Sequence, residues 1–190
     1  VRAGATRAKV GDGPREAGAV EGGLTGSGSV DLSASPDDVW KLLLDPDTLA
    51  AVVPGCEALE QVGEDSFTAQ VTIGVAGIKG VYNAEIDLRD KIEAQSVRLV
   101  GKASGALGFG EGEGQVTLEE IGDGRTRLSY TYRANVGGKV AAVGQRMLGT
   151  VTKLLIGQFF RGFDRRLRKD GDGENTRPGF FARLFRGGGS

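Results

Sequence analysis

The sequence offers few side chains that could do chemistry, and its three tyrosines are the main ones. The chain has no histidine, so it lacks the commonest general base near neutral pH and the commonest metal ligand. Tyr82, Tyr130 and Tyr132 fall on the parity expected to face inward in their strands. A tyrosine in an apolar cavity can donate a hydrogen bond to a ligand carbonyl. It can equally be a core aromatic whose hydroxyl reaches the rim, and the sequence leaves both interpretations open.

Other chemical signatures are weak. Cys56 is the single cysteine, so no intramolecular disulfide can form, and no basic neighbour in sequence would stabilise its thiolate. The glycine-rich stretch 105–114 continues as strand, and Glu111 and Glu113 within it would repel a phosphate. Glu85 and Asp87 alternate outward in their own strand. We therefore expect no catalytic residues, no metal site and no nucleotide site.

A ladder of glycines is the most informative pattern in the chain. Gly108, Gly110, Gly112 and Gly114 leave one face of a strand bare, because side chains alternate between the two faces. Glycine inside a strand often marks the close approach of another group. The backbone of a helix or an apolar ligand could lie against this face. The pattern predicts a cavity rather than an active site.

The elements that must build this cavity are visible as periodic segments. Ser35-Pro36-Asp37-Asp38 provides an N-cap, a proline in the first turn and acidic residues, which together predict a helix start. From residue 56 to 136 the hydrophobic period is two, with glycine-rich turns, which indicates an antiparallel meander. After residue 137 the period becomes helical, and one helix of roughly 45 Å is expected from about Gly138 to Lys169. The predicted fold class is α+β, a curved antiparallel sheet gripping a long C-terminal helix.

We expect one folded domain over residues 24–169. Residues 1–23 show no apolar period and are interpreted as a disordered extension, because they bury too little surface to offset ordering entropy. Residues 170–190 are interpreted as a flexible tail. Inward parity beside the glycine ladder predicts the residues that line the ligand cavity: Phe67, Val71, Ile73, Tyr82, Leu99, Gly108, Gly110, Gly112, Tyr132, Met147 and Val151.

The tail carries an amphipathic segment. On a helical wheel its apolar side chains fall on one side and its arginines on the other, a membrane-surface pattern made of Phe180, Phe181, Leu184, Phe185, Arg183 and Arg186. The segment could instead be a sticky disordered end, or it could dock on its own domain or on a partner. A formal net charge of −1 carries no nucleic-acid signature. The single cysteine and the lack of a signal-peptide pattern favour a cytoplasmic protein.

Several short motifs, in this order and spacing, resemble the carbon monoxide dehydrogenase G-subunit family of the START-like helix-grip superfamily. The resemblance covers about Leu24 to Leu167. It rests on Ser35-Pro36-Asp37-Asp38-Val39-Trp40, Pro54-Gly55-Cys56-Glu57, Gly105-Ala106-Leu107-Gly108-Phe109-Gly110, Val136-Gly137-Gly138-Lys139 and Gln158-Phe159-Phe160.

The resemblance implies a non-catalytic accessory protein. Members of that family are implicated in attaching a molybdenum-containing carbon monoxide dehydrogenase to the inner face of the cytoplasmic membrane and in its link to respiratory quinone. The resemblance thus implies that the partner is this enzyme or a related molybdenum hydroxylase. It also implies peripheral association with an anionic membrane surface, and menaquinone or a similar quinone as the ligand. The alternatives are a cyclase or aromatase-type enzyme on the same fold and a pure anchoring module without ligand.

Overall fold

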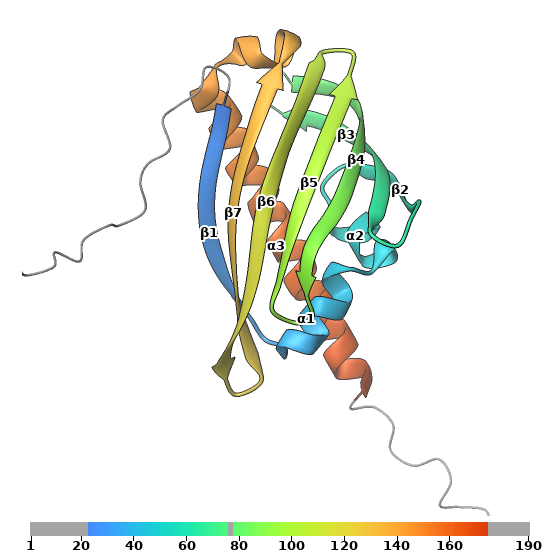
Figure 1. Ribbon diagram of the computed structural model, residues 1–190, viewed down its shortest axis with the longest axis vertical. Helices are drawn as coiled ribbons and strands as arrows, with labels where there is room; N and C mark the ends of the chain where they lie inside the picture. Colours follow the sequence, from blue (N-terminus) through green and yellow to red (C-terminus); the bar gives the residue numbers. More distant parts are fainter. Residues whose placement is uncertain (1–22, 76–77, 175–190) are drawn as a thin grey trace, which may run out of the picture.

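Figure 1 shows the protein as a computed structural model, which describes residues 23–75 and 78–174. The predicted extension before residue 23 lies outside the described residues. So do the predicted membrane-binding residues Phe180, Phe181, Arg183, Leu184, Phe185 and Arg186. The described part contains a sheet, two short helices and one long helix that lies across one face of the sheet (Figure 1).

The sheet has seven strands in the order β1-β7-β6-β5-β4-β3-β2, and every neighbouring pair is antiparallel. Strands β2 to β7 form the meander that the period of two predicts, while β1 returns to pair with β7 at the other edge. The strands are β1 (Gly23–Leu32), β2 (Cys56–Gln61), β3 (Ser66–Val75), β4 (Ile78–Ile92), β5 (Ser96–Gly105), β6 (Gly108–Gly122) and β7 (Arg125–Gly137).

Two short helices join β1 to β2, and the first begins at the predicted capping signal. Helix α1 (Pro36–Leu43) has Ser35 as its N-cap, whose hydroxyl accepts a hydrogen bond from the Asp38 backbone N–H at 3.3 Å. Helix α2 (Pro46–Val52) has Asp45 as its N-cap, whose carboxylate accepts from the Thr48 backbone N–H at 2.8 Å. Each cap satisfies a backbone donor that the first helical turn leaves free.

The C-terminal helix corrects one expectation. The sequence predicts one helix from Gly138, but the structure has a 3₁₀ helix, η1 (Gly138–Val143), followed by helix α3 (Gln145–Glu174). Gly144 between them has a φ of 85°, which breaks the helical hydrogen-bond ladder and which residues with a side chain rarely adopt. The glycine that periodicity placed inside the helix is therefore its N-terminal boundary.

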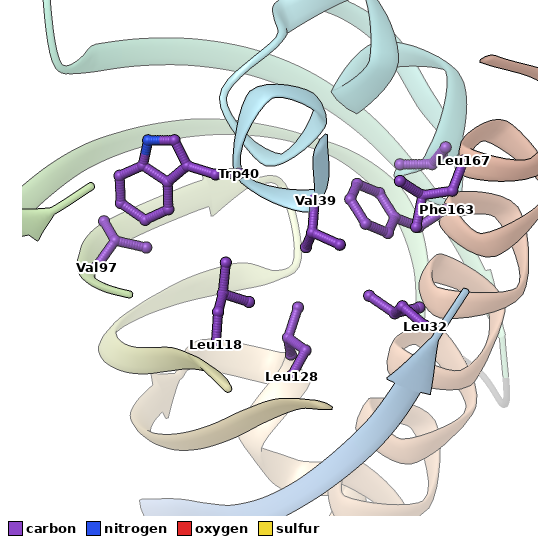
Figure 2. Close-up of a cluster of buried hydrophobic side chains, with 9 residues drawn as sticks. Leu32, Val39, Trp40, Val97, Leu118, Leu128, Phe163 and Leu167 are labelled. Atoms are coloured by element: carbon purple, nitrogen blue, oxygen red, sulfur yellow. The ribbon is translucent and has the colours of Figure 1, made fainter. Parts of the chain in front are cut away.

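The sheet and α3 enclose two hydrophobic clusters. The lower cluster joins residues from β1, α1, α2, β5, β6, β7 and α3, most of which Figure 2 shows converging on one point: Leu32, Val39, Trp40, Val52, Val97, Leu118, Leu128, Phe163 and Leu167. The upper cluster lies nearer the start of α3 and consists of Tyr82, Val140, Leu148 and Val151. Among the described helices, none is long and apolar enough to cross a membrane.

The outer face of the sheet carries the charges, as strand parity predicts. Glu85 pairs with Lys102 at 3.0 Å between their charged atoms. Glu113 lies between Arg98 and Arg133, at 3.5 and 2.5 Å. These carboxylates face solvent and basic partners on the side away from α3, so they are not available to the space between sheet and helix.

Candidate functional site

An apolar hollow of about 340 Å³ lies between α3 and strands β6 and β7. This hollow is largely open to solvent, and we call it the apolar chamber. Its lining contains no charged side chain, and strand alternation turns the side chains of Gln115 and Thr131 to the outer face. The volume falls at the lower end of the range of about 300–1,000 Å³ typical of ligand sites. The chamber is lined by Pro54, Gly114, Gln115, Val116, Tyr130, Thr131, Tyr132, Leu155, Ile156, Phe159 and Phe160.

Aromatic rings form one wall of the apolar chamber. Tyr130 of β7 stacks on Phe160 of α3 with ring centroids 5.4 Å apart, and Phe160 meets Phe159 edge-on at 5.2 Å. Phe159 in turn stacks on Phe163 of the lower cluster at 5.8 Å. Such pairs contribute more than their buried area alone, so this wall is held in place by the core. It presents aromatic side chains to the chamber.

The hydroxyls of two tyrosines extend from the chamber towards the edge of the sheet. Tyr130 and Tyr132 lie directly opposite Gly28 and Gly26 of β1 in the antiparallel register. A Cβ at either glycine would overlap the hydroxyl of the tyrosine opposite it. Each tyrosine side chain therefore lies directly over a glycine of β1. Desolvation by burial raises the pKa of Tyr132 above its ordinary value of 10.0. The phenol therefore remains protonated at neutral pH and can donate a hydrogen bond.

A second hollow adjoins the apolar chamber at Tyr132, which lines both. It lies between the first turns of α3 and the sheet, with Leu24, Gly112 and Gly149 among its lining residues. Its volume of about 1160 Å³ is an upper limit for the space beneath α3. The lining also includes Arg146 and Lys153 of α3 and residues such as Glu111, whose side chains point to the outer face, so this hollow is partly polar. The space available to a ligand therefore extends beyond the apolar chamber.

The structure brings only part of the predicted cavity lining together. Gly112 and Tyr132 line the hollows, whereas Tyr82 and Val151 are buried in the upper cluster. Ile73 packs against the upper cluster and Leu99 against the lower one. Phe67 is buried and Val71 is partly buried, but neither lines one of the three hollows described for this fold.

Three predicted lining residues lie elsewhere. Met147 is 42% exposed, because Leu148 and Val151 set the buried stripe of α3 and turn Met147 outward. Gly108 lies at the β5–β6 turn with a φ of 150°, where it borders a small hollow at the tip of the hairpin. Gly110 has only ordinary contacts at its Cβ position and does not line the apolar chamber.

Sequence reasoning placed the cavity too near the start of the helix and missed most of the aromatic wall. The chamber is lined further along α3, about one to two and a half turns beyond Val151, by Leu155, Ile156, Phe159 and Phe160. The apolar stripe of the helix and the Gln158-Phe159-Phe160 motif contain this signal. The stripe identifies the buried face of the helix, but it does not say which turns pack tightly and which border a space.

The described residues hold no metal constellation, since no group of three or more Cys, Asp or Glu side chains in residues 23–75 and 78–174 could bind an ion. Burial raises the pKa of the Cys56 thiol, which keeps it a weak nucleophile. The chemistry that the apolar chamber itself offers is apolar contact, ring stacking and hydrogen-bond donation by tyrosine.

A curved antiparallel sheet that grips a long C-terminal helix, with a chamber between them, defines a START-like helix-grip protein. Solved structures agree. A START superfamily protein from Mycobacterium smegmatis matches with a TM-score of 0.60 and 13% identity, over 76% of this chain and 97% of that one. The Zhui aromatase/cyclase from Streptomyces sp. R1128 matches with a TM-score of 0.61 and 18% identity, over 77% and 94%. At these identities the likeness is one of fold.

The family is more specific. The model of the carbon monoxide dehydrogenase G-subunit (CoxG) family matches residues 28–168, and the chain therefore belongs to that family. The expectation from the sequence motifs is confirmed. A conserved protein from Geobacillus kaustophilus has 44% identity and a TM-score of 0.75, over 77% of this chain and 96% of that one. No curated protein matches the chain.

Proposed function

We propose that this protein is a non-catalytic accessory protein that binds an apolar ligand between the sheet and α3 and serves a membrane-associated redox enzyme. The observation that carries the proposal is the apolar chamber, whose lining has aromatic and aliphatic side chains but no charged group. An acid or base is needed for most bond-making steps, whereas binding an apolar molecule requires only shape, burial and a few donors.

A quinone fits the chemistry of this site best. Its planar ring can stack on the wall formed by Tyr130, Phe159 and Phe160, and its isoprenoid chain can extend past Tyr132 into the neighbouring hollow. Its carbonyls can accept hydrogen bonds from tyrosine hydroxyls. We infer that menaquinone or a similar respiratory quinone is the ligand. Membership of the CoxG family supports this choice, because a carrier could bring quinone from lipid to an enzyme that reduces it.

The partner is inferred from the family. The family takes its name from carbon monoxide dehydrogenase, which points to the molybdenum-containing form of that enzyme, or to a related molybdenum hydroxylase, as the enzyme served. We propose that the protein recruits this enzyme to the inner face of the cell membrane. Support comes from the amphipathic pattern after residue 178 and from the cations in the last described turns of α3, including Arg165 and Lys169.

Two alternatives predict different behaviour. An enzyme of the aromatase/cyclase type on the same fold would turn over a small substrate, and replacing one ionisable residue would abolish that turnover. A pure anchoring module would bind vesicles but no quinone. The chamber favours the ligand-binding proposal over both, because it leaves a space of about 340 Å³ with no charged side chain in its lining.

The proposal is tested by asking what the protein carries and what it recruits. Mass spectrometry of lipids extracted from protein purified out of its native host should show a quinone at near-stoichiometric amounts. Carbon monoxide dehydrogenase should co-sediment with quinone-containing anionic vesicles only when this protein is present. Co-purified phospholipid alone, or vesicle capture of the enzyme without this protein, would contradict the proposal.

A further inference from the structure

One buried hydroxyl in the described structure has no partner. Tyr82 of β4 is 8% exposed, and its hydroxyl oxygen is buried without any hydrogen bond. It belongs to the upper cluster with Val140, Leu148 and Val151. Buried polar groups are nearly always hydrogen-bonded, and an orphan hydroxyl lowers stability. A phenylalanine would fill the same space without this penalty, so the hydroxyl calls for an explanation beyond packing.

Glycines of the surrounding strands fix the direction of this side chain. Gly105 lies directly opposite Tyr82 on β5, and a Cβ there would lie 2.8 Å from the Cδ1 atom of the ring. Gly80 lies two residues earlier on the same face, where a Cβ would lie 3.6 Å from Cε2. The ring therefore lies on a patch of sheet that has no side chains of its own. Its hydroxyl is held inside the fold rather than at the surface.

The environment of Tyr82 connects to both hollows. Leu155 packs against the upper cluster and also lines the apolar chamber. Leu24 packs against the same cluster and lines the second hollow. Every other member of the cluster and its packing shell is aliphatic: Val140, Leu148, Val151, Leu24, Ile73, Leu107, Val136, Val143 and Leu155. Among these hydrophobic residues, Tyr82 alone has a polar side-chain group.

We propose that Tyr82 is the hydrogen-bond donor for a carbonyl of the bound ligand and thereby selects carbonyl-bearing apolar molecules over hydrocarbons. The inference rests on the proposed function and names the atom that would give the site its chemical selectivity. Tyr82 itself lines neither hollow, so the ligand reaches its hydroxyl by displacing side chains at the edge of the upper cluster, beginning at Leu155, which lines the apolar chamber.

The hydroxyls of the other two tyrosines are differently placed. Those of Tyr130 and Tyr132 lie over Gly28 and Gly26 at the β1 edge, and neither is buried without a partner. Both residues are partly exposed, and a hydroxyl that solvent can reach gains less from a ligand carbonyl than a buried orphan donor does. Selectivity for a carbonyl is therefore assigned to Tyr82, and Tyr130 provides a matched control.

The test compares Tyr82→Phe with Tyr130→Phe and uses two ligands of the same ring skeleton. 2-Methyl-1,4-naphthoquinone has the carbonyls, and 2-methylnaphthalene lacks them. Calorimetric titration of the full chain should show that Tyr82→Phe weakens quinone binding about 3- to 10-fold, as expected for one hydrogen bond. It should leave the affinity for methylnaphthalene within about twofold. Tyr130→Phe keeps the ring that forms the chamber wall and should lower the ratio of the two affinities less than Tyr82→Phe does.

A second measurement on the ligand-free protein guards against a folding artefact. Tyr82→Phe should leave the urea unfolding midpoint unchanged or raise it, because it removes an unpaired buried hydroxyl. A lower midpoint would show that the hydroxyl has a partner in the protein and would overturn the inference. Equal quinone affinity of wild type and Tyr82→Phe would also overturn it, while the proposed function would stand. If the wild type binds neither ligand, both fail together.

Discussion

The most direct test of the apolar chamber is to fill it from the sheet. Gly114 of β6 lines the chamber, and a Cβ there would have only ordinary contacts, 3.4 Å to the Thr131 carbonyl oxygen and 4.0 Å to the Tyr132 Cβ. Gly114→Leu should therefore be tolerated by the backbone. Gly112 is a poorer choice, because its Cβ would lie 2.5 Å from the Arg133 carbonyl oxygen. That contact would strain the sheet, so a loss of ligand binding could result from unfolding rather than from filling of the chamber.

The expected effect follows from the volume. Four added carbons, each about the size of a water at ~30 Å³, would occupy roughly a third of the chamber of about 340 Å³. A ligand that loses burial of a similar number of carbons, at about 0.8 kcal/mol each, loses about 3 kcal/mol of binding free energy. This corresponds to a decrease in affinity of about two orders of magnitude. The assay is titration of the full chain with 2-methyl-1,4-naphthoquinone.

The matched control is Gly110→Leu on the same strand and the same face. A Cβ at Gly110 would lie 3.5 Å from the Asn135 carbonyl oxygen, and this residue does not line the chamber. Gly110→Leu should keep nearly the wild-type affinity, and both variants should unfold in urea no earlier than the wild type. Unchanged quinone binding by folded Gly114→Leu, or an equal loss in both variants, would refute the assignment of the site to this chamber.

Three further predictions concern stability and membrane binding. Phe163→Ala removes a fully buried ring that stacks on Phe159, so it should lower the free energy of unfolding by about 3–5 kcal/mol in urea titration. Leu154→Ala, at a position 41% exposed, should change that free energy by no more than about 0.5 kcal/mol. Asp45→Ala should cost about 1 kcal/mol at neutral pH, because it removes the N-cap of α2. Hydrogen bonds from Thr48 lower the pKa of Asp45 below 3.8, so its contribution is present above that pH and is lost as the pH falls through the folded-state pKa. An Asp45→Ala deficit that stays constant down to about pH 1 would contradict this linkage. Deleting residues 175–190 leaves α3 complete and should release the protein from anionic vesicles, whereas salt alone should weaken binding only in part. Equal co-sedimentation of the full and shortened chains would show that the tail is not the anchor.

Features encoded by neighbouring residues could be predicted from the sequence. The start of α1 follows from Ser35-Pro36, because capping depends on atoms within one helical turn. The antiparallel meander follows from the period of two and the glycine-rich turns, since each hairpin joins strands that are adjacent in the chain. The family could also be predicted, because the order and spacing of short motifs is itself a property of the sequence.

The candidate site depended on contacts between distant parts of the chain. Gly26 of β1 lies opposite Tyr132 of β7, and this register, set more than a hundred residues apart, decides where the tyrosine hydroxyl points. The hydrophobic period identifies the buried face of α3 but not which turns of the helix border the chamber. For this reason the sequence predicts Met147 in the cavity and does not predict Phe160 there. Sequence by itself determined the strands, the start of α1, most of the inward faces and the family, because those depend on local spacing. Only the tertiary structure decided the position of the apolar chamber and the isolation of the Tyr82 hydroxyl, because a space and an unpaired donor exist only once all the surrounding elements have packed.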